Sequence, residues 1–71
     1  MNTKSALEKL TDRQRETLEV NKSFLAEMRK NHNDDTSIET RSFIKGYLAA
    51  LRESGIVTET ERRLLWTYAT L

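Results

Sequence analysis

The stretch Leu48-Ala49-Ala50-Leu51-Arg52-Glu53-Ser54-Gly55-Ile56-Val57-Thr58-Glu59-Thr60-Glu61 decides the fold, because it contains the end of one helix and the start of another. Gly55 can adopt the left-handed conformation that closes a helix, and Ile56 can fold back on the last turn. Thr58 can accept a hydrogen bond from the Glu61 amide while the Glu61 side chain reaches back to the Thr58 amide, as in a capping box. The stretch therefore predicts a helical hairpin, but it indicates no chemistry.

The composition is typical of a small helical domain. The 71 residues are enough for one domain and lie near the lower limit for a chain that folds without staples. The chain has no proline, no cysteine and two glycines, so no disulfide or cysteine-based metal site can supplement a small core. The 12 basic and 11 acidic residues are interspersed and give a net charge of +1, which exerts no strong pull on nucleic acid or anionic lipid.

No segment of the sequence indicates contact with a membrane. The apolar runs are shorter than a membrane span, and the N-terminal residues lack the apolar core of a signal peptide. These absences predict a cytoplasmic protein.

The first helix is predicted over about residues 5–30, with an alternative break near Thr11. Ser5 to Glu8 and Thr11 to Gln14 both have the spacing of a capping box, and they cannot both begin the same helix. We favour the continuous helix, because its apolar stripe continues through both parts with a period of about 3.6 residues. The inward positions of this stripe are Leu7, Leu10, Gln14, Leu18, Asn21, Phe24, Leu25 and Met28.

Two further helices are predicted over about residues 37–54 and 59–70, after a loop at residues 31–35 that is rich in turn formers. Thr36 to Glu39 again has capping-box spacing at the start of the second helix. The inward positions are Phe43, Ile44, Tyr47, Leu48 and Leu51, with Ala50 at the edge, on the second helix and Leu64, Leu65, Tyr68 and Leu71 on the third. The chain is thus predicted to be a single all-α domain of three helices, in which a long N-terminal helix packs on a C-terminal helical hairpin.

A homodimer is also predicted, because so small a core leaves little net stability to a single copy. Ser42, Gly46 and Ala50 are spaced four apart, which lets another helix approach closely, although packing inside the monomer explains this spacing equally well. Asn21 can fix the register of a helix seam, although a solvated position at the edge of the core is the more common reason for such an interruption. The predicted dimer contacts are Asn21, Phe24, Ser42, Gly46 and Ala50.

No residue pattern indicates catalysis, a metal ion or a cofactor. His32 is the only histidine, and the acids that follow it lack the alternating positions, central glycine and final glutamate of a calcium loop. Gly46 and Gly55 are isolated, so there is no glycine-rich phosphate loop. Glu59 and Glu61 lie at a helix start, where their favourable interaction with the helix dipole explains them. We therefore expect a non-enzymatic protein with no cofactor.

Trp66 is the candidate anchor for a protein partner. If the final helix packs through its leucines, Trp66 is left near the surface beside Arg62 and Arg63. Tryptophan is enriched at binding hot spots, because it buries a large area with little loss of entropy. In the alternative, the first helix or the end of the chain covers Trp66 and the indole completes the core.

A DNA-binding helix-turn-helix is the main competing hypothesis. In that motif the N-terminal residues of the second helix approach the DNA, and here they include Glu59 and Glu61, whose charge opposes binding. A basic face of Lys22, Arg29 and Lys30 can still contact phosphates, but the interspersed glutamates favour an ordinary solvated surface.

The expected function is that of a small non-catalytic protein–protein interaction module, which acts as a regulator, inhibitor or adaptor. The alternative is a small dimeric nucleic-acid-binding transcriptional regulator. In size and economy the chain is similar to small helical accessory proteins of bacteriophages and plasmids, which often inhibit or redirect host machinery. The likeness is based on size and composition and on no sequence motif.

Overall fold

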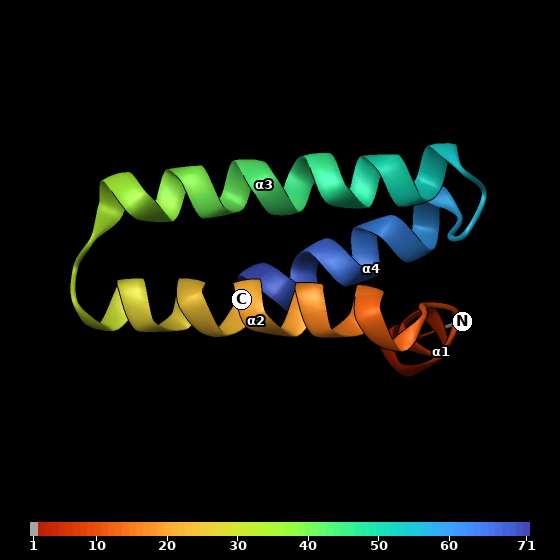
Figure 1. Ribbon diagram of the computed structural model, residues 1–71, viewed down its shortest axis with the longest axis horizontal. Helices are drawn as coiled ribbons and strands as arrows, with labels where there is room; N and C mark the ends of the chain where they lie inside the picture. Colours follow the sequence, from red (N-terminus) through yellow and green to blue (C-terminus); the bar gives the residue numbers. More distant parts are fainter. Residues whose placement is uncertain (1) are drawn as a thin grey trace.

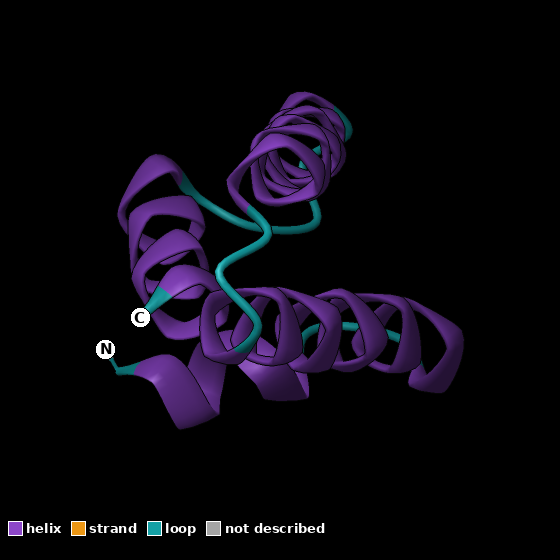
Figure 2. Ribbon diagram, turned by 90° about the vertical axis from the view of Figure 1, so that its left-hand side faces the viewer, coloured by secondary structure: helices purple, strands orange, loops and turns teal. Residues whose placement is uncertain are grey.

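Residues 2–71, which this computed structural model describes, form four helices and no strand. The helices are α1 (Thr3–Glu8), α2 (Asp12–Lys30), α3 (Asp34–Glu53) and α4 (Glu59–Thr70). Helices α2 and α3 form a long antiparallel hairpin, and α4 packs against both of them, while α1 packs on α4 (Figure 1). Viewed end-on, α4 lies to one side of the α2–α3 pair and leaves the opposite side of the pair uncovered (Figure 2). The predicted all-α fold class is therefore confirmed.

The first helix is divided near Thr11, so the continuous helix that we favoured over residues 5–30 is wrong and the alternative holds. The Thr11 hydroxyl accepts a hydrogen bond from the Gln14 amide at 3.1 Å, and Gln14 Oε1 accepts one from the Thr11 amide at 2.9 Å. Helix α1 is capped by Asn2 rather than Ser5, because Asn2 Oδ1 accepts a hydrogen bond from the Ser5 amide at 2.8 Å. The reciprocal capping box satisfies two backbone amides at once, and this outweighs the continuity of the apolar stripe.

Helix α3 begins at Asp34, earlier than predicted. The expected capping box at Thr36 does not form, and its hydroxyl instead donates to Asn33 Oδ1 at 3.1 Å. Asp34 and Asp35 lie in the first turn, where their charge interacts favourably with the positive end of the helix dipole. The two aspartates thus take the place of a side-chain cap, and the connection from α2 is short, with His32 at a left-handed φ of 55°.

The turn between α3 and α4 has the predicted geometry. Gly55 has a φ of 81°, and the Ile56 amide donates to the Leu51 carbonyl at 3.0 Å, as in a Schellman motif. The Thr58 hydroxyl accepts a hydrogen bond from the Glu61 amide at 3.2 Å, and Glu61 Oε1 accepts one from the Thr58 amide at 2.8 Å. The capping box and the bounds of the final helix are therefore confirmed.

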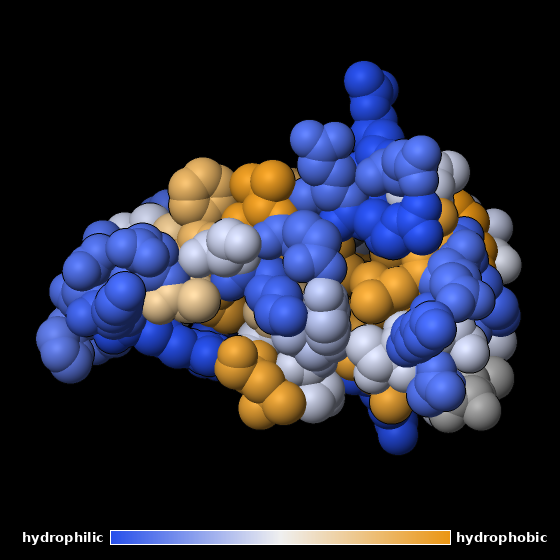
Figure 3. All heavy atoms as spheres, turned by 90° about the horizontal axis from the view of Figure 1, so that it is seen from below, coloured by the Kyte–Doolittle hydropathy of each residue, from blue (hydrophilic) through white to orange (hydrophobic). Residues whose placement is uncertain are grey.

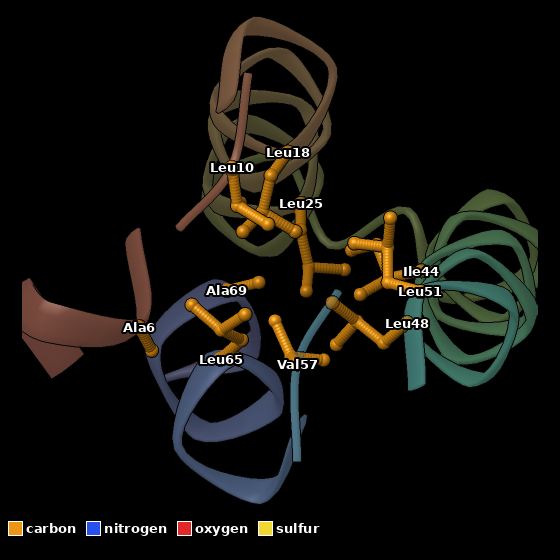
Figure 4. Packing of buried hydrophobic residues seen from close by; sticks show 10 residues of the cluster. All are labelled: Ala6, Leu10, Leu18, Leu25, Ile44, Leu48, Leu51, Val57, Leu65 and Ala69. Atoms are coloured by element: carbon orange, nitrogen blue, oxygen red, sulfur yellow. The ribbon is translucent and has the colours of Figure 1, made fainter. Parts of the chain in front are cut away.

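The core lies between the helices and consists chiefly of leucine (Figure 4). Its buried apolar members are Ala6, Leu10, Leu18, Leu25, Ile44, Leu48, Leu51, Val57, Leu65 and Ala69. The predicted inward positions of Phe24 and Phe43 are wrong, since these side chains are 56% and 49% exposed. Both lie on the side of the α2–α3 pair that no other described helix covers. Leu71, also predicted inward, follows the last residue of α4 and is 83% exposed.

The α2–α3 hairpin extends beyond the core at its connecting end (Figure 1). Between Leu25 and Ile44 the described chain has no buried residue. Helix α4 is shorter than α3, with 12 residues against 20, and the Arg29 guanidinium reaches back to donate to the carbonyl of Thr70. The end of the hairpin is therefore a two-helix structure, whereas the rest is packed on α4.

The two glycines provide a matched pair of stability tests. Gly46 lies within α3, with no atom inside 4 Å of the position that a Cβ would take. The substitution Gly46→Ala should raise the free energy of unfolding by about 0.5–1 kcal/mol, because alanine loses less backbone entropy in a helix. The substitution Gly55→Ala should lower it by about 1–2 kcal/mol, because the left-handed conformation disfavours a Cβ. Urea unfolding followed by circular dichroism measures both changes, and changes of the same sign would contradict this account.

Candidate functional site

Glu61 is a charged residue within the core, with 1% of its surface exposed. Its carboxylate caps α4 and also binds Lys9, which follows α1, with Nζ at 2.8 Å from Oε2 and 2.9 Å from Oε1. Hydrogen bonds from Lys9 and from the Thr58 amide lower the pKa of Glu61 below 4.5, although burial acts in the opposite direction. The role of this carboxylate is structural, because it fastens the end of α1 to the start of α4.

Arginine side chains surround Glu59 at the start of α4. Arg62 donates from Nε and Nη2 to the two carboxylate oxygens at 2.8 Å each, and Arg63 Nε donates at 3.2 Å. Arg52 Nε on α3 lies 3.4 Å from Oε1. The hydrogen bonds from Arg62 contribute most to lowering the pKa of Glu59 to about 2. Arg62 and Arg63, both predicted to bind a partner, are therefore already held by an acid of their own helix.

Trp66 is half-buried on α4 and packs against the core cluster. The indole therefore contributes to the packing of the monomer, and only part of its surface faces solvent. A role of Trp66 in binding a partner stays a prediction, but the structure does not place it as a free aromatic anchor.

Tyr68 joins α4 to α2. Its hydroxyl donates to the carboxylate of Glu19, and Lys22 Nζ lies 3.7 Å from the ring centroid in a cation–π contact. The hydrogen bond to Glu19 is the main cause that raises the pKa of Tyr68 to about 12, with burial acting in the same direction. Lys22 was predicted to contribute to a basic face, and it is instead engaged between the two helices.

Two residues of the predicted basic face, Lys22 and Arg29, make contacts with α4. Arg29 donates to the carbonyl of Thr70 at the end of α4, and Lys30 is exposed as the last residue of α2. Since Lys22 and Arg29 both take part in contacts between α2 and α4, neither presents an uncommitted charge to a phosphate.

Exposed apolar side chains gather on the side of the α2–α3 hairpin that faces away from α4, which we call the outer face. The outer face consists of Val20 and Phe24 from α2 and Phe43 and Tyr47 from α3. Val20 is 46% exposed, and the half-buried Tyr47 stacks on Phe43 with 5.8 Å between the ring centroids. The sequence analysis selected Phe24 as a dimer contact but missed Val20. Val20 lies one helical turn before Phe24, and this spacing could have placed both on the same face of α2.

On α2, the contacts to neighbouring helices locate the outer face. Glu19 and Lys22 contact α4 from one flank of α2, whereas the Met28 sulfur accepts from the Thr40 hydroxyl of α3 at 3.6 Å on another flank. Successive residues of a helix point about 100° apart around its axis. Val20 and Phe24 therefore project from α2 on the side past Met28, away from α4.

On α3, contacts to α2 and α4 also locate the outer face. Arg52 contacts Glu59 of α4, and Thr40 contacts α2. Phe43 and Tyr47 lie beyond the Thr40 flank, again away from α4. The four side chains of the outer face thus belong to one side of the molecule.

Two hollows lie along the exposed side of α2, and both are open to solvent. One hollow is lined by Glu19, Val20, Ser23, Phe24 and Glu27, and the other by Arg13, Glu16, Thr17, Val20 and Asn21. Seen from the α2 side, apolar atoms lie at the surface between hydrophilic side chains (Figure 3). An open apolar surface of this kind suits contact with a macromolecule better than the enclosure of a small substrate.

The other predicted dimer contacts lie at or near the surface. Ser42, Gly46 and Ala50 are exposed along α3, so packing within the described monomer does not explain their spacing. Asn21 is half-buried, and its amide donates to the carbonyl of Thr17 at 2.8 Å. The small-residue row therefore remains available for a contact outside the monomer.

Between residues 2 and 71, histidine, aspartate and glutamate do not gather in groups of three or more that could hold a metal ion. Within this range, every buried polar side-chain atom has a hydrogen-bond partner. The described helices also include none with the length and apolar character required to cross a membrane.

Comparisons of the chain with protein-family models, with curated proteins and with solved structures find no match.

The ion pair of Glu61 can be tested with Lys9→Met, which keeps most of the aliphatic stem. Because the folded state lowers the pKa of Glu61, the charged carboxylate stabilises the fold at neutral pH, and this contribution is lost as the pH falls below 4.5. Lys9→Met should therefore lower the urea midpoint at neutral pH, and its difference from wild type should shrink in acid. Lys4→Met, at an exposed position of α1, is the matched control. A difference that is independent of pH would contradict the account.

The bond between Tyr68 and Glu19 can be tested at alkaline pH. The folded state raises the pKa of Tyr68 from 10.0 to about 12, so its stabilising contribution is complete below pH 10 and is lost as the pH rises towards 12. A titration of phenolate absorbance should show a step near pH 12 that Tyr68→Phe removes and Tyr47→Phe leaves in place. Persistence of the step in Tyr68→Phe would show that another group causes it.

Proposed function

We propose that the protein is a small non-catalytic protein–protein interaction module, a regulator, inhibitor or adaptor that presents its outer face to a protein partner. The observation that supports this proposal is the exposed apolar surface of Val20, Phe24 and Phe43, on the side of the hairpin opposite α4. Large apolar side chains that gather on one exposed face are a common mark of interaction sites.

The physical driving force is the burial of this surface. Full burial of one large apolar side chain contributes about 1.5–3 kcal/mol, and the parts still exposed on the outer face can supply a share of this to binding. The stacked pair of Phe43 and Tyr47 presents aromatic area with little side-chain entropy to lose. Arg13 and Glu27, which line the ends of the hollows, can form a polar rim.

The alternative function, a small dimeric nucleic-acid-binding transcriptional regulator, has less support. Lys22, Arg29 and Arg62 are each engaged in contacts within the monomer, and using them on DNA would require breaking those contacts. Affinity for a DNA duplex that falls steeply with salt would favour this alternative.

The proposal is tested by placing a charge on the outer face. Phe24→Asp puts a carboxylate at its centre, whereas Ile38→Asp puts one on another side of α3, at a position 63% exposed. A partner captured with the wild-type protein and then purified should bind Phe24→Asp about tenfold more weakly or worse, because loss of a hot spot costs at least this much. Titration calorimetry should find its affinity for Ile38→Asp close to wild type.

Circular dichroism should show that both variants fold. A partner that binds Phe24→Asp as well as wild type would exclude the outer face as its binding site. Equal weakening by Phe24→Asp and Ile38→Asp would also count against the proposal, because the effect would then follow from added charge and not from position.

A further inference from the structure

Exposed acids border the outer face on both of its helices. Glu16 and Glu27 line the two hollows of α2, on either side of Val20. Glu39 is exposed on α3 one helical turn before Phe43 and therefore lies on the same side of that helix. The apolar centre of the outer face is thus bordered by carboxylates on α2 and on α3.

Bases on α2 and α3 project chiefly from other sides of these helices. Arg52 contacts α4, and Lys45 lies seven residues before it on the same side of α3. Lys22 contacts α4 from α2, and Arg15 likewise precedes it by seven residues. By the same periodicity, the further bases that lie away from the outer face are Arg29, Lys30 and Arg41.

Arg13 is the base that remains on the outer side of α2 within the described residues. It lines the same hollow as Glu16, which follows it by three residues, and this spacing makes the two side chains neighbours on the helix surface. The charge of Arg13 is therefore offset locally. The outer face has an acidic border, although the chain as a whole has a net charge of +1.

We propose that the outer face binds a basic amphipathic helix of another protein. The apolar stripe of that helix lies on Val20, Phe24 and Phe43, and its lysines or arginines lie beside the acidic border. Carboxylates at the rim favour a partner of opposite charge, and they repel nucleic acid, anionic lipid and the equally acidic outer face of a second copy. The inference rests on the proposed function, because it names the partner of the same face.

The shape of the face suits a helix. Helix α4 already packs on both α2 and α3 from one side of the pair, and the outer face is the corresponding surface on the opposite side. Val20 and Phe24 occupy successive turns of α2, and Phe43 and Tyr47 occupy successive turns of α3. Rows of this kind are the ridges between which the side chains of another helix pack. The two hollows together extend over residues 13–27, about 21 Å along α2, so about four helical turns cover them.

The test uses a synthetic peptide of about 15 residues, with leucines at i, i+3, i+4 and i+7 along one helical face and lysines elsewhere. One control peptide has glutamate in place of every lysine, and a second has the same composition as the lysine peptide in scrambled order. Titration calorimetry should show binding of the lysine peptide to the wild-type protein, and the affinity should fall as salt screens the border charges. Both control peptides should bind at least about tenfold more weakly, because each lacks one of the two complementary features.

Charge reversal at the border locates the site. Glu27→Lys and Glu39→Lys should each bind the lysine peptide about threefold more weakly or worse, because each replaces an attraction at the rim by a repulsion. Glu8→Lys is the matched control, since it makes the same change at an exposed position of α1, which packs on α4. It should keep the wild-type affinity, and circular dichroism should show that all three variants fold.

Failure of the wild-type protein to bind the lysine peptide would overturn the inference. Equal weakening by Glu8→Lys and Glu27→Lys would also overturn it, because net charge and not position would then explain the binding. Control peptides that bind as tightly as the lysine peptide would exclude a basic amphipathic helix as the ligand. Self-association of wild type in sedimentation velocity that Phe24→Asp abolishes would instead identify a second copy as the occupant.

These results can be separated from those on the proposed function. If the captured partner fails to bind Phe24→Asp but binds Glu27→Lys and Glu39→Lys as well as wild type, the outer face is an interaction site and the basic partner alone is wrong. If the lysine peptide depends on the border acids as expected and the captured partner still binds Phe24→Asp, the inference stands and the proposed use of the outer face for that partner is wrong.

Discussion

The carboxylate of Glu61 connects parts of the chain that lie far apart in sequence. It starts α4 through the amide of Thr58 and receives the ammonium group of Lys9 while lying inside the core. A buried charge is costly unless it is paired and hydrogen-bonded, so the position of α1 and the start of α4 are determined together. Helix α1 has six residues and is too short to be stable alone. Its placement depends on this ion pair and on the burial of Ala6 and Leu10.

Features of the fold with a local cause were predictable from the sequence. Gly55 and the box formed by Thr58 and Glu61 involve residues a few positions apart, and both formed where the spacing indicated. The exposure of Phe24 and Phe43 was not predictable, because periodicity shows which side of a helix is apolar but not how many neighbours cover it. A broad apolar arc was assumed to face the core, whereas α4 covers only part of it.

In the candidate site, too, features with a local cause could be predicted, whereas those that depend on another helix could not. Small residues on α3 were selected from their spacing alone, and the structure leaves Gly46 and its neighbours exposed. Arg62 and Lys22 were selected for their charge, and both have partners within the monomer. The partner of Arg62 lies three residues before it on the same helix, a spacing that allows an ion pair and was a usable signal. The partner of Lys22 is an aromatic ring on another helix, for which no local signal exists.

The overhanging end of the hairpin gives the molecule two regions of unequal rigidity. Resistance to local opening follows local burial, which stops at Leu25 and Ile44. Phe24 and Phe43 stand at this boundary, so a partner bound there would also hold the looser end in place. Part of the binding energy would then be spent on ordering that end, and the α2–α3 connection would show slower amide exchange and greater resistance to proteases without any change of fold.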